Sequence, residues 1–179
     1  MNRNSLGLVR ALALAFALAC STLAAQGASF TVLGAPCSVP GEAIPAIGAR
    51  GLPRIGASFD VTYSGPNRTF SSAQQIVRPW LITGLSLLPA PVAIPTAILP
   101  QQPANCLVWP NPDLVLEMPV DASGQAFQNA VTLVIPNQGA LVGATWYHQW
   151  FALFEQCGFA GCNYGWAIVS EAAIVVAGT

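Results

Sequence analysis

Short segments that alternate between hydrophobic and polar residues recur along the chain. The clearest is Ser58–Ser64, where Phe59, Val61 and Tyr63 face one way and the polar residues between them face the other. A period of two residues is typical of a β-strand with one buried face. Similar patterns, bounded by glycine, proline and asparagine, predict further strands at Ser29–Leu33 and at residues 76–88, 106–109, 114–118 and 127–135.

The C-terminal region contains two long apolar stretches. Residues 141–154 are apolar on both faces, and Trp146, Trp150 and Phe154 also lie four residues apart, as they would on an amphipathic helix. Because β-branched and aromatic residues are frequent here and the neighbouring segments are strands, we expect a strand, with the helix as the alternative. Residues 166–176 are predicted to be the return strand of a hairpin.

Prolines interrupt the middle of the chain, where a long connection is predicted. At this density they exclude a helix and a central strand, since each one lacks a backbone N–H. Many short strands separated by turns predict an all-β fold, an antiparallel β-sandwich of the jelly-roll or immunoglobulin-like type. We expect residues 26–179 to form this single domain. The prolines in question are Pro89, Pro91, Pro95, Pro100 and Pro103.

The N-terminus has the pattern of a secretory signal peptide, predicted here as residues 1–25. Arg3 and Arg10 provide the positive charge, and a short apolar run and small residues follow. The run is too short for a membrane-spanning helix, which needs about 20 apolar residues. A rival interpretation is a lipoprotein anchored through Cys20, because the residues before it loosely resemble a bacterial lipobox. We therefore expect an extracellular, periplasmic or cell-surface protein whose mature chain does not span a membrane.

Removal of the signal peptide would leave four cysteines. An even number of cysteines in an exported domain favours disulfides. Cys157 and Cys162 are close in sequence across a loop with two glycines, so we predict one bridge there and, by elimination, a second between Cys37 and Cys106. Four cysteines allow three pairings. The alternative is a four-cysteine zinc site, although the spacing lacks the two Cys-x-x-Cys pairs that are typical of one.

Charged residues are rare, and this limits the kinds of partner that the protein is expected to bind. They make up 7% of the chain, against roughly 25% in typical soluble domains, and every basic residue is arginine. Without Arg3 and Arg10 the mature chain has 4 arginines and 7 acidic residues, a formal charge of −3. Electrostatic binding of nucleic acid is therefore not expected. Association through an apolar, weakly charged surface is expected instead.

No catalytic constellation can be recognised in the sequence. His148 is the only histidine, no Gly-x-Ser-x-Gly motif is present, and the absence of lysine excludes a Schiff base. His148 stands between Tyr147 and Gln149 in an apolar segment, so we expect it to be a buried, hydrogen-bonded structural residue. No metal site or cofactor is predicted, because no group of histidines, cysteines or carboxylates has the spacing of metal ligands.

Tryptophan is the residue type in this sequence whose side chain, if exposed, could bind a ligand. Most of the five tryptophans lie within apolar strands and are expected in the core. Trp109, which is next to Pro110 and a polar turn, and Trp166 are the candidates for an indole ring that binds a ligand. An exposed planar ring of this kind would stack on a glycan.

A series of short motifs runs in order along residues 34–177. They are Cys37 in its Gly/Pro-rich loop, Gly51-x-Pro53-x-Ile55-Gly56, Asn105-Cys106-Leu107, Asp121-x-x-Gly124, Ile135-Pro136-Asn137, Leu141-Val142-Gly143 and Tyr147-x-Gln149-Trp150. In this order they resemble an uncharacterised family of small secreted β-sandwich domains common in GC-rich bacteria such as planctomycetes and myxobacteria. The chain departs from the family at Ser170-Glu171-Ala172, where members often carry Ser-Asn-Gly. The resemblance implies export and a β-sandwich, and it supplies no catalytic residue.

The sequence therefore predicts a secreted or cell-surface domain with a structural or interaction role and no enzymatic activity. Its partner would be a second copy of the chain or another protein at the cell surface. One alternative is a carbohydrate-binding module that uses Trp109 or Trp166, which requires exposed indole rings. The other is an envelope hydrolase that uses His148, which requires an exposed imidazole beside a serine and an acid.

Overall fold

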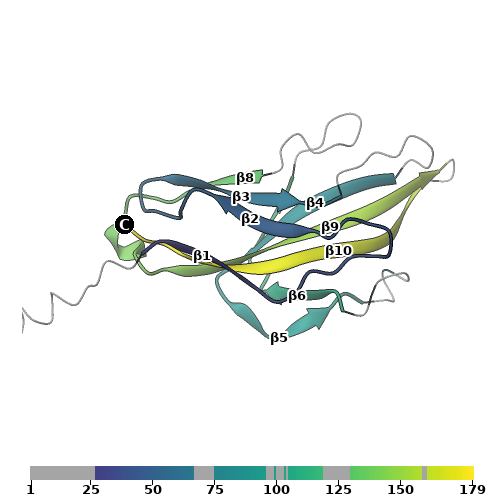
Figure 1. The fold of residues 1–179 in the computed structure, drawn as a ribbon, viewed down its shortest axis with the longest axis horizontal. Helices are drawn as coiled ribbons and strands as arrows, with labels where there is room; N and C mark the ends of the chain where they lie inside the picture. The colour runs from purple at the N-terminus through teal and green to yellow at the C-terminus, as the bar shows by residue number, and fades with distance from the viewer. Residues whose placement is uncertain are drawn as a thin grey trace, which may run out of the picture.

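A computed structural model shows an almost all-β protein built from antiparallel sheets (Figure 1). It describes residues 27–66, 75–95, 99, 103, 105–118, 130–158 and 161–179, and the side chains of 75, 76, 156–158, 161 and 162 are outside this description. The predicted signal peptide lies outside the described residues. Within the described part of the chain, no helix has the length and apolar character needed to cross a membrane.

The larger layer is a five-stranded sheet. Its strands run in the order β1 (Ser29–Leu33), β10 (Gly161–Val176), β9 (Thr145–Gly158), β4 (Gln75–Gly84) and β7 (Leu114–Glu117). Every neighbouring pair is antiparallel. The two longest strands, β9 and β10, form the predicted hairpin, so this hairpin is the centre on which the other strands assemble.

The second layer is a three-stranded sheet in which β3 (Ser58–Ser64) lies between β2 (Ala46–Arg50) and β8 (Ala130–Val134). Strand β3 is buried at every second residue, as its alternating sequence predicts. Its buried face packs on the five-stranded sheet, which gives the sandwich. The bounds of β1 and β3 are the ones predicted from the sequence.

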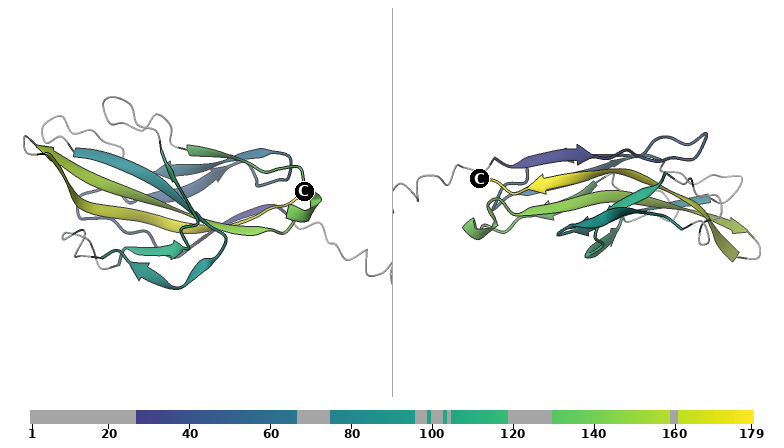
Figure 2. Two further views of the ribbon diagram at one scale, coloured as in Figure 1. Left: turned by 180° about the vertical axis from the view of Figure 1, so that it is seen from behind. Right: turned by 90° about the horizontal axis from the view of Figure 1, so that it is seen from below.

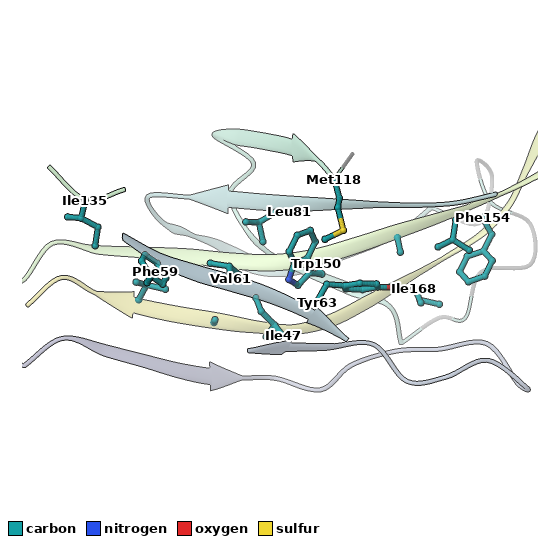
Figure 3. Packing of buried hydrophobic residues seen from close by; sticks show 14 residues of the cluster. Ile47, Phe59, Val61, Tyr63, Leu81, Met118, Ile135, Trp150, Phe154 and Ile168 are labelled. Carbon is teal, nitrogen blue, oxygen red and sulfur yellow. The ribbon is translucent and has the colours of Figure 1, made fainter. Parts of the chain in front are cut away.

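The hydrophobic core fills the space between these two sheets (Figure 3). Trp150 of β9 is fully buried there, and its ring contacts that of Tyr63 at a centroid distance of 5.5 Å. Its indole N–H donates to the carbonyl oxygen of Thr62 at 2.9 Å, so one side chain joins the layers by packing and by a hydrogen bond. The other buried members are Ile47, Phe59, Val61, Val77, Leu81, Met118, Ile135, Ala152, Phe154, Ile168, Ala173 and Val175.

A two-stranded ribbon lies on the other side of the larger sheet. It consists of β5 (Leu87–Ala93) and β6 (Leu107–Pro110), and Figure 1 shows it on the side away from β2, β3 and β8. Figure 2 shows the same arrangement from behind and from below. The central strand β9 is therefore approached from both faces, which explains why its sequence is apolar on both.

Three details of the strand prediction are wrong. Strand β2 lies in the Gly/Pro-rich segment between Cys37 and Pro53, which the sequence predicts to be a loop. The single strand predicted at 76–88 is two strands, because the chain leaves the sheet at Leu85 and Ser86, where the Leu85 N–H donates to the Asp113 carboxylate at 2.7 Å. The prolines of β5 are tolerated because this strand pairs on one side only. The helix alternative for 141–154 is also wrong, since a short 3₁₀ helix at Gly139–Leu141 is followed by β9.

A disulfide joins Cys37 to Cys106, as predicted. It excludes the alternative of a zinc site made from all four cysteines, because a disulfide sulfur is not a thiolate ligand. In the β9–β10 hairpin the backbones of Cys157 and Cys162 face each other in register. Their side chains lie outside the description, so the second bridge stays a prediction.

Candidate functional site

The alternation of β9 divides its side chains between two apolar environments. Trp150, Ala152 and Phe154 point into the core, whereas Phe151 and Leu153 lie on the opposite face of the sheet. Phe151 is only partly buried, and its ring lies 5.9 Å from that of Trp80 on the neighbouring strand β4. The outer face of the sheet thus carries an aromatic pair that the core does not cover.

Around this pair, three adjoining hollows with volumes of about 310, 380 and 390 Å³ follow the sheet and the ribbon. They share Phe151, are lined almost entirely by apolar side chains, and are wide open to solvent. A contiguous exposed apolar surface of this kind is typical of a contact site. We call it the Phe151 face and define it by Trp80, Val92, Val108, Val115, Phe151 and Leu153.

An ion triad stands beside the Phe151 face. Arg78 of β4 contacts Glu155 through Nε at 3.2 Å and Glu117 through Nη1 at 3.3 Å. Arg78 precedes Trp80 by two residues on the same strand, so the triad continues the same face of the sheet. The charges compensate one another to within one unit, so they do not prevent an apolar partner from approaching.

The ribbon is fastened to the larger sheet by the fully buried side chain of Gln149. Its Oε1 accepts the backbone N–H of Trp109 at 3.0 Å, and its Nε2 donates to the carbonyl oxygens of Leu107 and Ser170, each at 2.9 Å. Residues of β6, β9 and β10 are thereby joined by one amide. Ser170 lies in a β-bulge of β10, so Gln149 also satisfies backbone that the sheet leaves unpaired.

The Cys37–Cys106 disulfide fastens the ribbon at a second point. Cys106 immediately precedes β6, and the Cys37 N–H donates to the carbonyl oxygen of Val169 in β10 at 2.8 Å. Both sulfur-bearing residues are buried together with Val169, and Phe151 packs against them. The Phe151 face is therefore held in shape by a covalent link and a hydrogen-bonded link.

Trp109 is less open than the sequence suggests. It lies on β6, is partly buried, and its ring packs against the backbone of Gly34, which has a φ of 77°. A Cβ on Gly34 would come within 3.0 Å of the indole nitrogen, so only glycine leaves room for this contact. Trp109 is thus a packed residue of the ribbon rather than a free stacking platform.

Trp166 lies elsewhere, on β10, and shares no described pocket with Trp109. One face of its ring stacks on Phe154 at a centroid distance of 5.1 Å and an interplanar angle of 27°. It also lines a separate pocket with Val39, Pro40 and Glu42. Of the two candidate tryptophans, Trp166 therefore lines a pocket formed by described residues.

His148 is fully buried, as expected for a structural residue. Its Nε2 accepts the indole N–H of Trp146 at 2.9 Å, which leaves the proton of the neutral ring on Nδ1, 2.9 Å from the Thr83 hydroxyl. Desolvation lowers the pKa of His148 to about 4. The exposed imidazole that a hydrolase would need is not found at this position.

The titration of His148 makes stability depend on pH. The unfolded chain takes up a proton near pH 6.5 and the folded chain only near pH 4, so stability is complete above pH 6.5 and is lost as the pH falls towards 4. Between pH 7.5 and pH 5 we expect the free energy of unfolding to fall by about 2 kcal/mol. Urea unfolding at both pH values measures this.

The matched variant is His148→Gln, which keeps polar contacts and cannot titrate. Because His148 is the only histidine, the variant should show almost no change in stability over the same interval. Carboxyl groups ordinarily titrate below pH 5, outside this interval. An equal pH dependence in wild type and variant would contradict the assignment.

Gln149 and Phe151 were not singled out as functional residues by the sequence. The available signal is the two-sided apolar pattern of 141–154, which places Phe151 and Leu153 on a second apolar surface. A glutamine within such a segment is a further signal, because a buried amide must find hydrogen-bond partners. Glu42, which lines the Trp166 pocket, lies in a Gly/Pro-rich loop whose sequence gives no indication of a binding residue.

Among the described residues, no group of three or more histidines, cysteines or carboxylates is placed to hold a metal ion. Comparison with known proteins found no matching family model, no matching curated protein and no matching solved structure.

Proposed function

We propose that this chain is a secreted or cell-surface interaction domain, without catalytic activity, that associates with a second copy of itself through the Phe151 face. The observation that carries the proposal is the open apolar surface around Phe151 and Trp80, next to a ribbon that is fastened by a disulfide and by Gln149. Tryptophan and other aromatic residues at the centre of such a surface are the usual anchors of protein interfaces.

The lining of the face favours a protein over a small apolar ligand. Pockets for small molecules place a few polar groups that orient the ligand, whereas these hollows are lined almost entirely by apolar side chains. In an isologous dimer the same surface of both copies forms the interface, so the Phe151 face of one copy would pack on the Phe151 face of the other. With 7% charged residues, the chain offers little electrostatic repulsion against this contact.

The location outside the cytoplasm is part of the same proposal. A disulfide that closes a long loop is typical of oxidising compartments, and the N-terminal pattern is that of a signal peptide. Mass spectrometry of the protein recovered from culture medium and envelope fractions tests cleavage near residue 25. An uncleaved cytoplasmic chain would contradict this part of the proposal.

Charge substitutions on the Phe151 face test self-association. Val92 and Val115 are about half exposed (52% and 50%), so glutamate is tolerated in the monomer at both positions. We expect Val115→Glu and Val92→Glu each to weaken the dimer at least about tenfold, because a carboxylate would be buried without a partner. Sedimentation velocity over a concentration series measures the change in Kd.

The matched control is Val134→Glu. Val134 is 76% exposed on β8, in the other sheet, and should leave the association constant unchanged. A wild-type protein that stays monomeric at several hundred micromolar would overturn the proposal, and so would a control that weakens the dimer equally. A monomer that binds a fluorescent fatty acid at this face would assign the face to an acyl chain instead.

A further inference from the structure

A second pocket lies away from the Phe151 face, between the loop that precedes β2 and the inner side of β10. It has a volume of about 310 Å³ and is lined by Val39, Pro40, Glu42 and Trp166. This size is at the lower end of the roughly 300–1,000 Å³ of small-molecule sites. Unlike the hollows around Phe151, its lining is about equally polar and apolar.

Two polar atoms of this lining are left without partners. Glu42 Oε2 and Trp166 Nε1 are both buried, and neither has a hydrogen bond within the described residues. Buried polar groups are almost always paired, so an unpaired one needs an explanation. Here an unpaired acceptor and an unpaired donor, from elements far apart in the chain, belong to two residues that line the same pocket.

The pocket is built on fixed structure. On the loop side, the Ser38 hydroxyl lies 3.2 Å from the carbonyl oxygen of Ala43, and the Glu42 N–H donates to the Val39 carbonyl oxygen at 3.1 Å. The disulfide at Cys37 fastens the start of this loop. On the other side, stacking on Phe154 fixes the Trp166 ring. The loop backbone and the indole ring therefore lose little conformational entropy when the pocket binds a ligand, and only the Glu42 side chain has to be ordered.

We propose that this pocket binds a neutral hydroxylated ring, a single sugar unit. A sugar hydroxyl donates one hydrogen bond and accepts another, which matches the carboxylate of Glu42 and the indole N–H of Trp166. The C–H face of the ring packs on Val39 and Pro40. The flexible Glu42 side chain changes rotamer to admit the ligand, a common response to binding.

The chemistry of the pair excludes the charged alternatives. A ligand carboxylate or phosphate would be repelled by Glu42, and none of the described residues that line the pocket is cationic. An ammonium ion would pair with Glu42 and leave the indole N–H unsatisfied. A neutral hydroxyl can satisfy both atoms, since it donates to the carboxylate and accepts from the indole N–H.

The test uses the methyl glycosides of glucose, galactose, mannose and N-acetylglucosamine as probes. In ¹⁵N-labelled protein each tryptophan side chain gives one indole N–H resonance, and Trp166→Phe assigns that of Trp166. We expect at least one glycoside to shift this resonance with a Kd in the millimolar range. Glu42→Gln should raise that Kd about tenfold, because a charge-assisted hydrogen bond becomes a neutral one.

The matched control is Glu117→Gln, the same change in the ion triad, which lies on the opposite face of the larger sheet from Trp166. It should leave the Kd unchanged, as should Val115→Glu, so that failure here and failure of the dimer proposal are distinguishable. Thermal unfolding of Glu42→Gln confirms that the variant is folded. The proposal is overturned if no glycoside shifts the Trp166 resonance, if Glu42→Gln leaves the Kd unchanged, or if choline binds and the glycosides do not.

Discussion

Replacing both Cys37 and Cys106 by serine is expected to lower the free energy of unfolding by about 4 kcal/mol. The two residues are 69 positions apart, and opening so long a loop returns considerable conformational entropy to the unfolded chain. The loss is a large part of the 5–15 kcal/mol that typically stabilises a domain. Guanidinium unfolding of the oxidised wild type and of the double variant measures the difference.

The second predicted bridge provides the comparison. If Cys157 and Cys162 are joined, their double serine variant opens only a short hairpin loop and should lose roughly 2 kcal/mol. Reduction of the wild type should reproduce the sum of both losses. A loss below about 1 kcal/mol for the Cys37/Cys106 pair would show that the disulfide does not stabilise the fold by restricting the unfolded chain.

Gln149→Met should destabilise the protein by about 3 kcal/mol or more, although methionine has nearly the same shape. The substitution leaves the N–H of Trp109 and the carbonyl oxygens of Leu107 and Ser170 without a partner in a buried site. Each unpaired buried group costs about 1–3 kcal/mol. Urea unfolding gives the magnitude, and hydrogen exchange at the Trp109 amide locates the loosened contact.

Gln138→Met is the matched control. Gln138 is exposed next to the short 3₁₀ helix and makes no capping hydrogen bond through its side chain, so its loss should stay within about 0.5 kcal/mol. If both variants lose the same small amount, Gln149 does not fasten the ribbon. If Gln149→Met is destabilised but the Trp109 amide stays protected, the hydrogen bonds to β6 are not the cause.

The strands were predictable where β-branched and aromatic residues alternate with polar ones, whereas β2, with the sequence Ala-Ile-Gly-Ala-Arg, is predicted to be a loop. In Ser58–Ser64 the period of two residues survives folding unchanged, because β3 has the core on one side only. The pattern at 141–154 indicated an element buried on both sides, but it did not show that the β5–β6 ribbon covers the second side. The break at Leu85 could not be predicted, because it depends on Asp113, which is distant in sequence and accepts the Leu85 N–H.

The candidate sites were harder to predict, because they are made of tertiary contacts. Residue type alone selected Trp109 and Trp166, yet the first packs against Gly34 and the second lines a pocket formed by described residues. Glu42 is a candidate binding residue because it lines the same pocket as Trp166. The spacing of the two residues in the sequence carries no information about this proximity. His148 was assigned correctly to the interior because it lies in a largely apolar segment, which is local information.

The position of Val169 bears on the order in which the molecule can be assembled. A chain made from its N-terminus presents Cys37 and Cys106 before β9 and β10 exist. The backbone that holds Cys37 in place belongs to β10, near the C-terminus. The two thiols therefore meet in native geometry only after β10 has been synthesised, so the native disulfide forms after the chain is complete. A nascent chain that oxidises earlier does so without the β10 backbone that positions Cys37.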